Sequence, residues 1–198
     1  MSEVCSDIVD CPHTTPHFTR DGIPVIRTTA VRDGSFVKEE ITYTSKEEYE
    51  ERVSRLVPQS GDIVFTREAP VGEAFVIPNG MRLSLGQRTM LLRPQSKVLN
   101  AFYFVCLLYE PSFRRKLMVL AGGSTNPHLN VAEVRDLSIP LPPIEEQHTI
   151  AECVSTLDAR LLAGQANLAQ LELVKSALSQ SLLTGHTNTK KGEPQHAS

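Results

Sequence analysis

The feature that most constrains this 198-residue chain is the stretch from residue 144 to about residue 184, which holds no proline and one internal glycine. Steps of alternating three and four residues along it define a seam of eleven positions, eight of them apolar. The apolar ones are Ile150, Val154, Leu157, Leu161, Leu168, Leu171, Leu178 and Leu182, and the exceptions are Gln147, Gly164 and Lys175. The pattern predicts one helix of about 38 residues, about 57 Å long.

A seam of this length can be covered in two ways. The helix could fold back onto its own domain, or it could pair with a second helix. We favour a partner helix, because the seam is longer than the surface that a domain of about 140 residues usually presents to one helix. The three exceptions would then set the register or direction of pairing. Gly185 is expected to end the helix, and residues 186–198 are expected to form a disordered tail.

Residues 1–143 predict an α+β domain in which packed helices accompany a mixed β-sheet. Short β-rich runs bounded by turn residues lie at 23–29, 62–66, 73–77, 89–93 and 134–139. Helices are predicted from the N-cap Ser45, over 100–109 and over 111–120. A domain of this size can bury an adequate core without disulfides or metals.

Charge and cysteine content exclude several classes of protein. The net charge of −3 excludes a globally basic nucleic-acid wrapper. Residues 67–116 nevertheless hold eight basic and three acidic side chains, so a local basic face remains open. Four scattered cysteines with no CxxC pair indicate cytosolic thiols. Since there is no run of 18 apolar residues and no signal peptide, we expect a cytoplasmic protein without membrane association.

Motifs typical of catalytic or metal sites are absent from the sequence. The glycine-rich stretch before Gln87 lacks the lysine of a P-loop, and neither GxSxG nor HExxH occurs. Cys5, Cys11, His13 and His17 are spaced too loosely for a zinc site, and prolines between them oppose a helix. We therefore expect this chain to have no catalytic residue and to bind no metal or cofactor.

Several polar side chains in or beside loops are suited to DNA. Arginine can neutralise phosphates or read guanine, and asparagine or glutamine can read adenine. The DNA-binding candidates are Arg67, Gln87, Arg88, Ser124, Asn126, His128 and Asn130. The alternative is that such arginines form a solvated surface, or that Arg67 belongs to an internal salt-bridged turn.

Four stretches in this order make the chain resemble the specificity (S) subunit of type I restriction–modification systems. They are DIVDCPHTTP (7–16) followed by GIPVIR (22–27); GDIVFTREAPVGE (61–73); LGQRTMLLR (85–93); and GSTNPHLN (123–130) leading into IPLPPIEEQ (139–147). The resemblance covers about nine-tenths of the chain, roughly residues 5–185.

The resemblance implies a non-catalytic subunit with two functional parts. Residues 1–143 would be a target recognition domain that binds one half of a bipartite site in double-stranded DNA. Residues 144–185 would be a spacer helix that docks the methyltransferase (M) subunit. In such complexes the M subunit binds S-adenosylmethionine, and a restriction (R) subunit, which could also be a partner here, uses ATP with magnesium.

The chain departs from the family pattern because it holds one recognition domain and one helix, where a typical S subunit holds two of each. No internal repeat is visible. We expect a half-length subunit that forms an antiparallel homodimer through its helix. The alternative is an interaction module that pairs with a full S subunit or sequesters M subunits. In either case the candidate DNA residues could instead brace the domain or face the M subunit.

Overall fold

The computed structural model describes residues 1–122 and 127–184. Its contacts divide the chain into two compact units, Met1–Glu152 and Cys153–Ser198. The first unit holds all the strands of the described residues, and the described part of the second unit is helical. The predicted α+β class, with mixed sheets and one long C-terminal helix, is confirmed.

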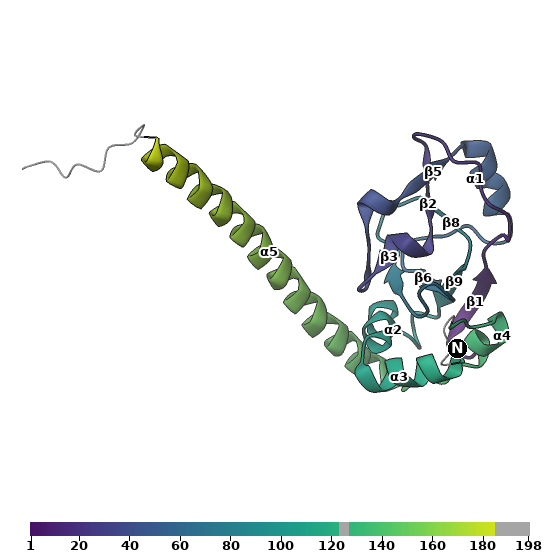
Figure 1. The fold of residues 1–198 in the computed structure, drawn as a ribbon. Coiled ribbons are helices and arrows are strands. Elements are labelled where there is room, and N and C mark those ends of the chain that lie inside the picture. The colour runs from purple at the N-terminus through teal and green to yellow at the C-terminus, as the bar shows by residue number, and fades with distance from the viewer. Residues whose placement is uncertain (123–126, 185–198) are drawn as a thin grey trace, which may run out of the picture. The chain divides into compact units, whose positions relative to one another are not determined.

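The larger sheet of the first unit has four strands in the order β1-β9-β6-β7 (Figure 1). These are β1 (Cys5–Asp10), β9 (Thr89–Pro94), β6 (Ile63–Thr66) and β7 (Ala74–Val76), and every neighbouring pair is antiparallel. All four residues of β6 are buried, because this central strand is covered on both faces.

Alternation along the strands sends side chains into two separate apolar clusters. Ile63 and Phe65 of β6 belong to one cluster, and Val64 between them belongs to the other. The first cluster also contains Leu92 of the neighbouring strand, and the second contains Leu91. A one-residue slip of either strand would exchange these faces, so burial fixes the register.

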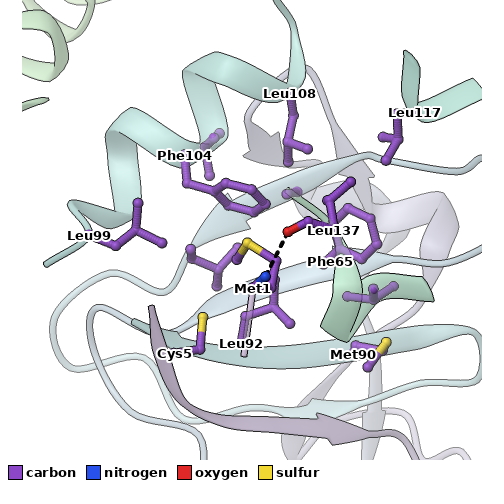
Figure 2. Packing of buried hydrophobic residues seen from close by; sticks show 14 of the residues in the cluster. Met1, Cys5, Phe65, Met90, Leu92, Leu99, Phe104, Leu108, Leu117 and Leu137 are labelled. Atoms are coloured by element: carbon purple, nitrogen blue, oxygen red, sulfur yellow. Dashed lines mark hydrogen bonds between the residues drawn. The ribbon is translucent and has the colours of Figure 1, made fainter. Parts of the chain in front are cut away.

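The first cluster receives side chains from α2 (Ala101–Leu108), α3 (Pro111–Leu120) and α4 (Val131–Asp136), and Ala151 from the C-terminal helix. Figure 2 shows Phe104 and Leu108 of α2 lying above the sheet residue Phe65. The Asn100 side chain caps α2 by accepting from the backbone N–H of Tyr103 at 2.9 Å.

A smaller three-stranded sheet, in the order β5-β2-β8, supports the second cluster. Strand β2 pairs antiparallel with β5 and parallel with β8. The elements in this part are β2 (Ile23–Ile26), η1 (Thr28–Ala30), β3 (Val31–Arg32), β4 (Ser35–Phe36), η2 (Lys38–Glu40), β5 (Thr42–Thr44), α1 (Lys46–Arg52) and β8 (Ser84–Leu85). Ser45 caps α1 as predicted, accepting from the backbone N–H of Glu48.

Most predicted elements of the first unit are present, and one is wrong. The runs at 62–66, 73–77 and 89–93 are β6, β7 and β9, and the helices at 100–109 and 111–120 are α2 and α3. The strand predicted at 134–139 does not form, because α4 occupies the first half of this segment and the rest is irregular. Asn130 and Glu133 form a reciprocal capping box that starts this helix.

The long helix α5 (Ile144–Leu183) is continuous over 40 residues, and its first nine residues belong to the first unit. The expected stop at Gly185 and the expected tail at 186–198 lie outside the described residues. None of the described helices combines the length and apolar character needed to span a lipid bilayer.

The prediction that Gln147 is an exception within a pairing seam is wrong. Its side chain is fully buried in the first unit, where it donates to the carbonyl oxygens of Val98 and Pro142 at 3.0 and 2.9 Å. Its Oε1 accepts from the backbone N–H of Asn100 at 2.9 Å. Ile150 likewise packs against the first apolar cluster. The start of the seam therefore anchors α5 to its own domain.

Candidate nucleic-acid interface and helical surface

Three loops that are far apart in the sequence meet at one end of the larger sheet. Thr66 of β6 pairs with Thr89 of β9, so the loops beyond these residues leave the sheet together. The backbone N–H of Arg67 donates to the Arg88 carbonyl at 2.9 Å, and that of Leu129 donates to the Arg67 carbonyl at 2.9 Å. The structure thus brings three of the candidate positions, 67, 88 and 128–130, onto one surface.

Arg88 is the most available of the arginines in these loops. Its side chain is 55% exposed, and its Nε lies 2.7 Å from Oε1 of Glu68. Its backbone φ of +69° places it in the left-handed region, which turns the residue out of the strand. An exposed ion pair of this kind contributes little to stability, so DNA could compete for the guanidinium at a small cost.

A groove of about 460 Å³ opens beside this ion pair. It is lined by Glu68, Pro70, Val71, Arg88, Arg114 and Met118, among others. The mixture of two guanidinium groups with apolar walls could accept part of a DNA backbone or a protein side chain.

Arg67 occupies a different environment. Its side chain is only 14% exposed, and Nε lies 3.1 Å from Oδ1 of Asp10 on β1. Its Nη1 donates to the carbonyl oxygen of Leu129 at 3.2 Å. Arg67 therefore ties β1 to the loop before α4, a placement that favours the bracing interpretation over DNA contact.

Of the other DNA-binding candidates, some are exposed and some use their side chains in local hydrogen bonds. Gln87 is exposed, but its Nε2 donates to the His13 carbonyl and to Oγ1 of Thr15, both at 3.2 Å. His128 is exposed beside Glu68. The Oδ1 atom of Asn130 accepts from the backbone N–H of Glu133 and so caps α4. The remaining candidates, Ser124 and Asn126, lie outside the described residues.

Two further groups on this unit were not singled out from the sequence. Arg52 is buried, and its Nη2 donates to the Leu85 carbonyl at 2.9 Å, which holds the turn that presents Gln87. Phe18 is 45% exposed, and the Arg27 guanidinium lies 5.7 Å from its ring centroid. The i, i+4 spacing of Glu48 and Arg52 was a weak signal for the first group, and nothing local marked the second.

The basic character counted over residues 67–116 is largely neutralised in space. Four of its eight cations are in ion pairs: Arg67 with Asp10, Arg88 with Glu68, Arg93 with Asp62 and Arg114 with Glu73. Two of these acids lie outside the counted segment, so a count along the sequence overstates the free positive charge. Fewer than eight of these basic side chains are therefore available to form the expected basic face.

The buried carboxylate of Glu73 has a structural role in the first unit. Glu73 accepts from the hydroxyl of Tyr109 at 2.7 Å, from Nη2 of Arg114 at 2.6 Å and from the Asp33 backbone N–H at 3.0 Å. Burial alone would raise the pKa of Glu73, but the Tyr109 and Arg114 hydrogen bonds outweigh it and lower the pKa. Burial, followed by the hydrogen bond to Glu73, raises the pKa of Tyr109. Both groups thus stay in one protonation state near neutral pH.

The described residues, 1–122 and 127–184, contain no group of three histidine, cysteine, aspartate or glutamate side chains placed to hold a metal ion. Cys5 and Cys11 are buried, and burial raises the pKa of both thiols. Neither thiol is placed to act as a nucleophile.

The described part of the second unit, residues 153–184, presents an apolar surface of its own. The six seam leucines on it are between 43% and 63% exposed: Leu157, Leu161, Leu168, Leu171, Leu178 and Leu182. No atom lies within 4 Å of a Cβ built at Gly164. A hollow of about 390 Å³ surrounds this glycine, lined by Leu157, Leu161 and Leu168 among others.

Comparison with known proteins shows that this chain is similar to specificity subunits of type I restriction enzymes. A family model described as the type I restriction modification DNA specificity domain matches residues 12–173. The EcoKI specificity subunit of Escherichia coli is 26% identical over 187 residues, which cover 89% of this chain and 39% of that subunit. The MjaVIII specificity subunit of Methanocaldococcus jannaschii is 26% identical over 181 residues, covering 87% and 42%. The chain thus spans about two fifths of the length of these curated relatives.

Solved structures show the same fold. The HsdS subunit from Thermoanaerobacter tengcongensis matches with a TM-score of 0.58 and 24% identity, over 92% of this chain and 42% of that one. A chain from a study of complex assembly and conformational transition in the type I R-M system matches with a TM-score of 0.61 and 24% identity, over 92% and 43%. The match covers both units in each case.

Proposed function

Because this chain belongs to the family of type I restriction modification DNA specificity domains, we propose that it selects the DNA sequence on which a type I restriction–modification complex acts. The first unit would bind one half of a bipartite site in double-stranded DNA. The helix α5 would dock an M subunit and pair with α5 of a second copy. The observation that carries this proposal is an α+β unit with an exposed loop surface around Arg88, followed by a long helix whose leucine row is exposed.

The loop surface at the end of the larger sheet supports the DNA-binding part. Arg88 and His128 are exposed there, and Gln87 lies on the adjoining turn. Arg88 is held by an exposed ion pair that a phosphate or a guanine edge could replace. Two copies would each present this surface, so the expected target is an inverted repeat with unread base pairs between its halves.

The chain is proposed to be non-catalytic, as the family implies. Glu73 and Tyr109 are held in fixed protonation states, and Glu73, just before β7, binds Tyr109 at the end of α2 and Arg114 of α3. Methyl transfer with S-adenosylmethionine would then be the work of the M subunit, and any ATP-driven step that of an R subunit. This chain would supply only position and sequence choice.

The test is binding to a randomised pool of DNA duplexes by the purified chain together with its M subunit, followed by sequencing of the bound fraction. We expect enrichment of one inverted repeat with a fixed spacer. Enrichment of one contiguous asymmetric site would contradict the two-copy arrangement. Failure to enrich any sequence, with a correctly assembled complex, would contradict the proposed function itself.

A second candidate is an interaction module that pairs with a full-length specificity subunit. The exposed leucine row on α5 favours it equally, since any matching helix could cover that row. The two candidates differ in solution mass. A chain that stays monomeric alone and forms a complex only with a full-length subunit would favour the module.

A further inference from the structure

The polar and small residues that interrupt the seam of α5 specify how a second copy would lie on it. We propose that two copies pair antiparallel through residues 150–182, with the two-fold axis crossing the seam at the level of residue 166. This inference rests on the proposed homodimer and assigns its register. The leucines that it pairs all lie in the second unit, where they are exposed.

The spacing of the seam allows only a few antiparallel registers. With the axis at residue 166, every seam position from Ile150 to Gly164 has a seam position at the same distance after the axis. The facing pairs are 164 with 168, 161 with 171, 157 with 175, 154 with 178 and 150 with 182. In this register every seam position from 150 to 182 has a partner. If the axis moves by half a heptad in either direction, seam positions at one end of the helix face no seam position of the second copy.

The hollow at Gly164 provides the first independent argument. In the proposed register Gly164 faces Leu168 of the second copy, so a large side chain enters the space that the glycine leaves open. In a parallel, in-register pair Gly164 would face its own copy and leave a void in the seam. Packing therefore disfavours the parallel arrangement.

The charge at Lys175 provides the second argument. In a parallel, in-register pair the two Lys175 ammonium groups would share one layer and repel. In the proposed register Lys175 faces Leu157 of the second copy, and the neighbouring Asp158 of that copy flanks it. Glu172, three residues earlier on its own helix, lies on the same side. All three charged side chains are exposed in the single chain and can form this cluster.

Shifted antiparallel registers lack this complementarity. Moving the axis half a heptad places Lys175 opposite either Ile150 or Gly164 of the second copy. The flanking residues would then be Ala151 or Gln165, and neither carries a charge. Only the axis at residue 166 gives Lys175 an acidic neighbour across the interface.

Charge exchange in the full-length chain tests the register by sedimentation equilibrium. Lys175→Glu and Asp158→Lys should each raise the dimer dissociation constant about tenfold, because each places like charges together across the interface. The double variant should return to within about threefold of the original value. Arg160→Glu, which lies on the opposite flank facing Val174, is the matched control and should change little. Additive losses in the double variant would overturn the register.

Distances between spin labels on the native Cys153 give an independent readout, in a chain where Cys106 is alanine. Cys153 is exposed and lies thirteen residues before the axis, so the two labelled positions should be about 39 Å apart along the pair. A parallel pair would bring them to about 10 Å, the spacing of packed helices. A short distance, or a chain that remains monomeric, would overturn the inference.

These outcomes separate the register from the proposed function. A dimer in another register that still enriches one DNA sequence with the M subunit would refute the register alone. A dimer with the expected label distance that enriches no sequence would refute the function and leave the register standing.

Discussion

Replacing Gln147 with methionine should unfold the first unit far more easily than any other single change on α5. Methionine has nearly the same length, but it can neither donate nor accept in place of the amide. Three backbone groups would lose their partner: the N–H of Asn100 and the carbonyl oxygens of Val98 and Pro142. The side chain is fully buried, so water cannot replace the amide without opening the packing.

The size of the effect follows from these three hydrogen bonds. Each contributes a net value of about 1 kcal/mol, and a buried group left without a partner costs about 1–3 kcal/mol. A loss of about 3 kcal/mol in the free energy of unfolding is the central expectation. For a domain of about 150 residues this lowers Tm by about 6–12 °C.

The assay is thermal and urea unfolding followed by the near-ultraviolet circular dichroism of tyrosine. All four tyrosines lie in the first unit, so the signal reports that unit and not the remainder of α5: Tyr43, Tyr49, Tyr103 and Tyr109. Gln170→Met, at an exposed position of the same helix, is the matched control. A loss below about 1 kcal/mol, or one equal to the control, would refute the anchoring role of Gln147.

Four further variants test other parts of the first unit. Arg93→Met should lower the free energy of unfolding by about 3 kcal/mol in urea, because it leaves the buried Asp62 carboxylate without its ion pair; a neutral result contradicts this. Glu73 has a lowered pKa, so its stabilisation is present above the unfolded value of about 4.3 and is lost as pH falls through the folded pKa. Glu73→Gln should therefore flatten the urea midpoint against pH on the acid side, and an unchanged slope would refute the assignment. In gel-shift titrations with the M subunit, Arg88→Ala should weaken DNA binding by about 1–3 kcal/mol with normal unfolding, whereas Arg67→Ala should lower stability; the reverse pattern would exchange their roles.

Secondary structure was predictable wherever short-range signals agreed. The apolar run at 62–66 and the N-cap Asn100 each lie next to the element that they define. The strand prediction for residues 134–139 was wrong, because a short apolar run before prolines has the same composition in a strand as in a short helix. The capping box of Asn130 and Glu133 was the local signal that distinguishes them.

The candidate site was harder to predict, because its residues differ only in distant partners. Arg67 and Arg88 look equivalent along the sequence. In the structure Arg67 contacts Asp10, which is 57 positions away in the sequence. Arg88 instead stays exposed and is paired with Glu68. Gln147 fits the helical period of the seam equally well whether it faces a second helix or its own domain. Such differences are set by tertiary packing, which no local pattern encodes.

The uncovered leucine row of α5 also has a consequence for the fate of this chain inside a cell. A newly made copy without a partner presents a row of exposed leucines along α5, beyond the first turns that are anchored in the first unit. Chaperones and proteases recognise exposed apolar segments of this kind, and assembly removes them by mass action. Surplus copies would therefore be degraded while assembled ones persist. Under the proposed pairing, the amount of this chain in the cell would follow the amount of its helical partner.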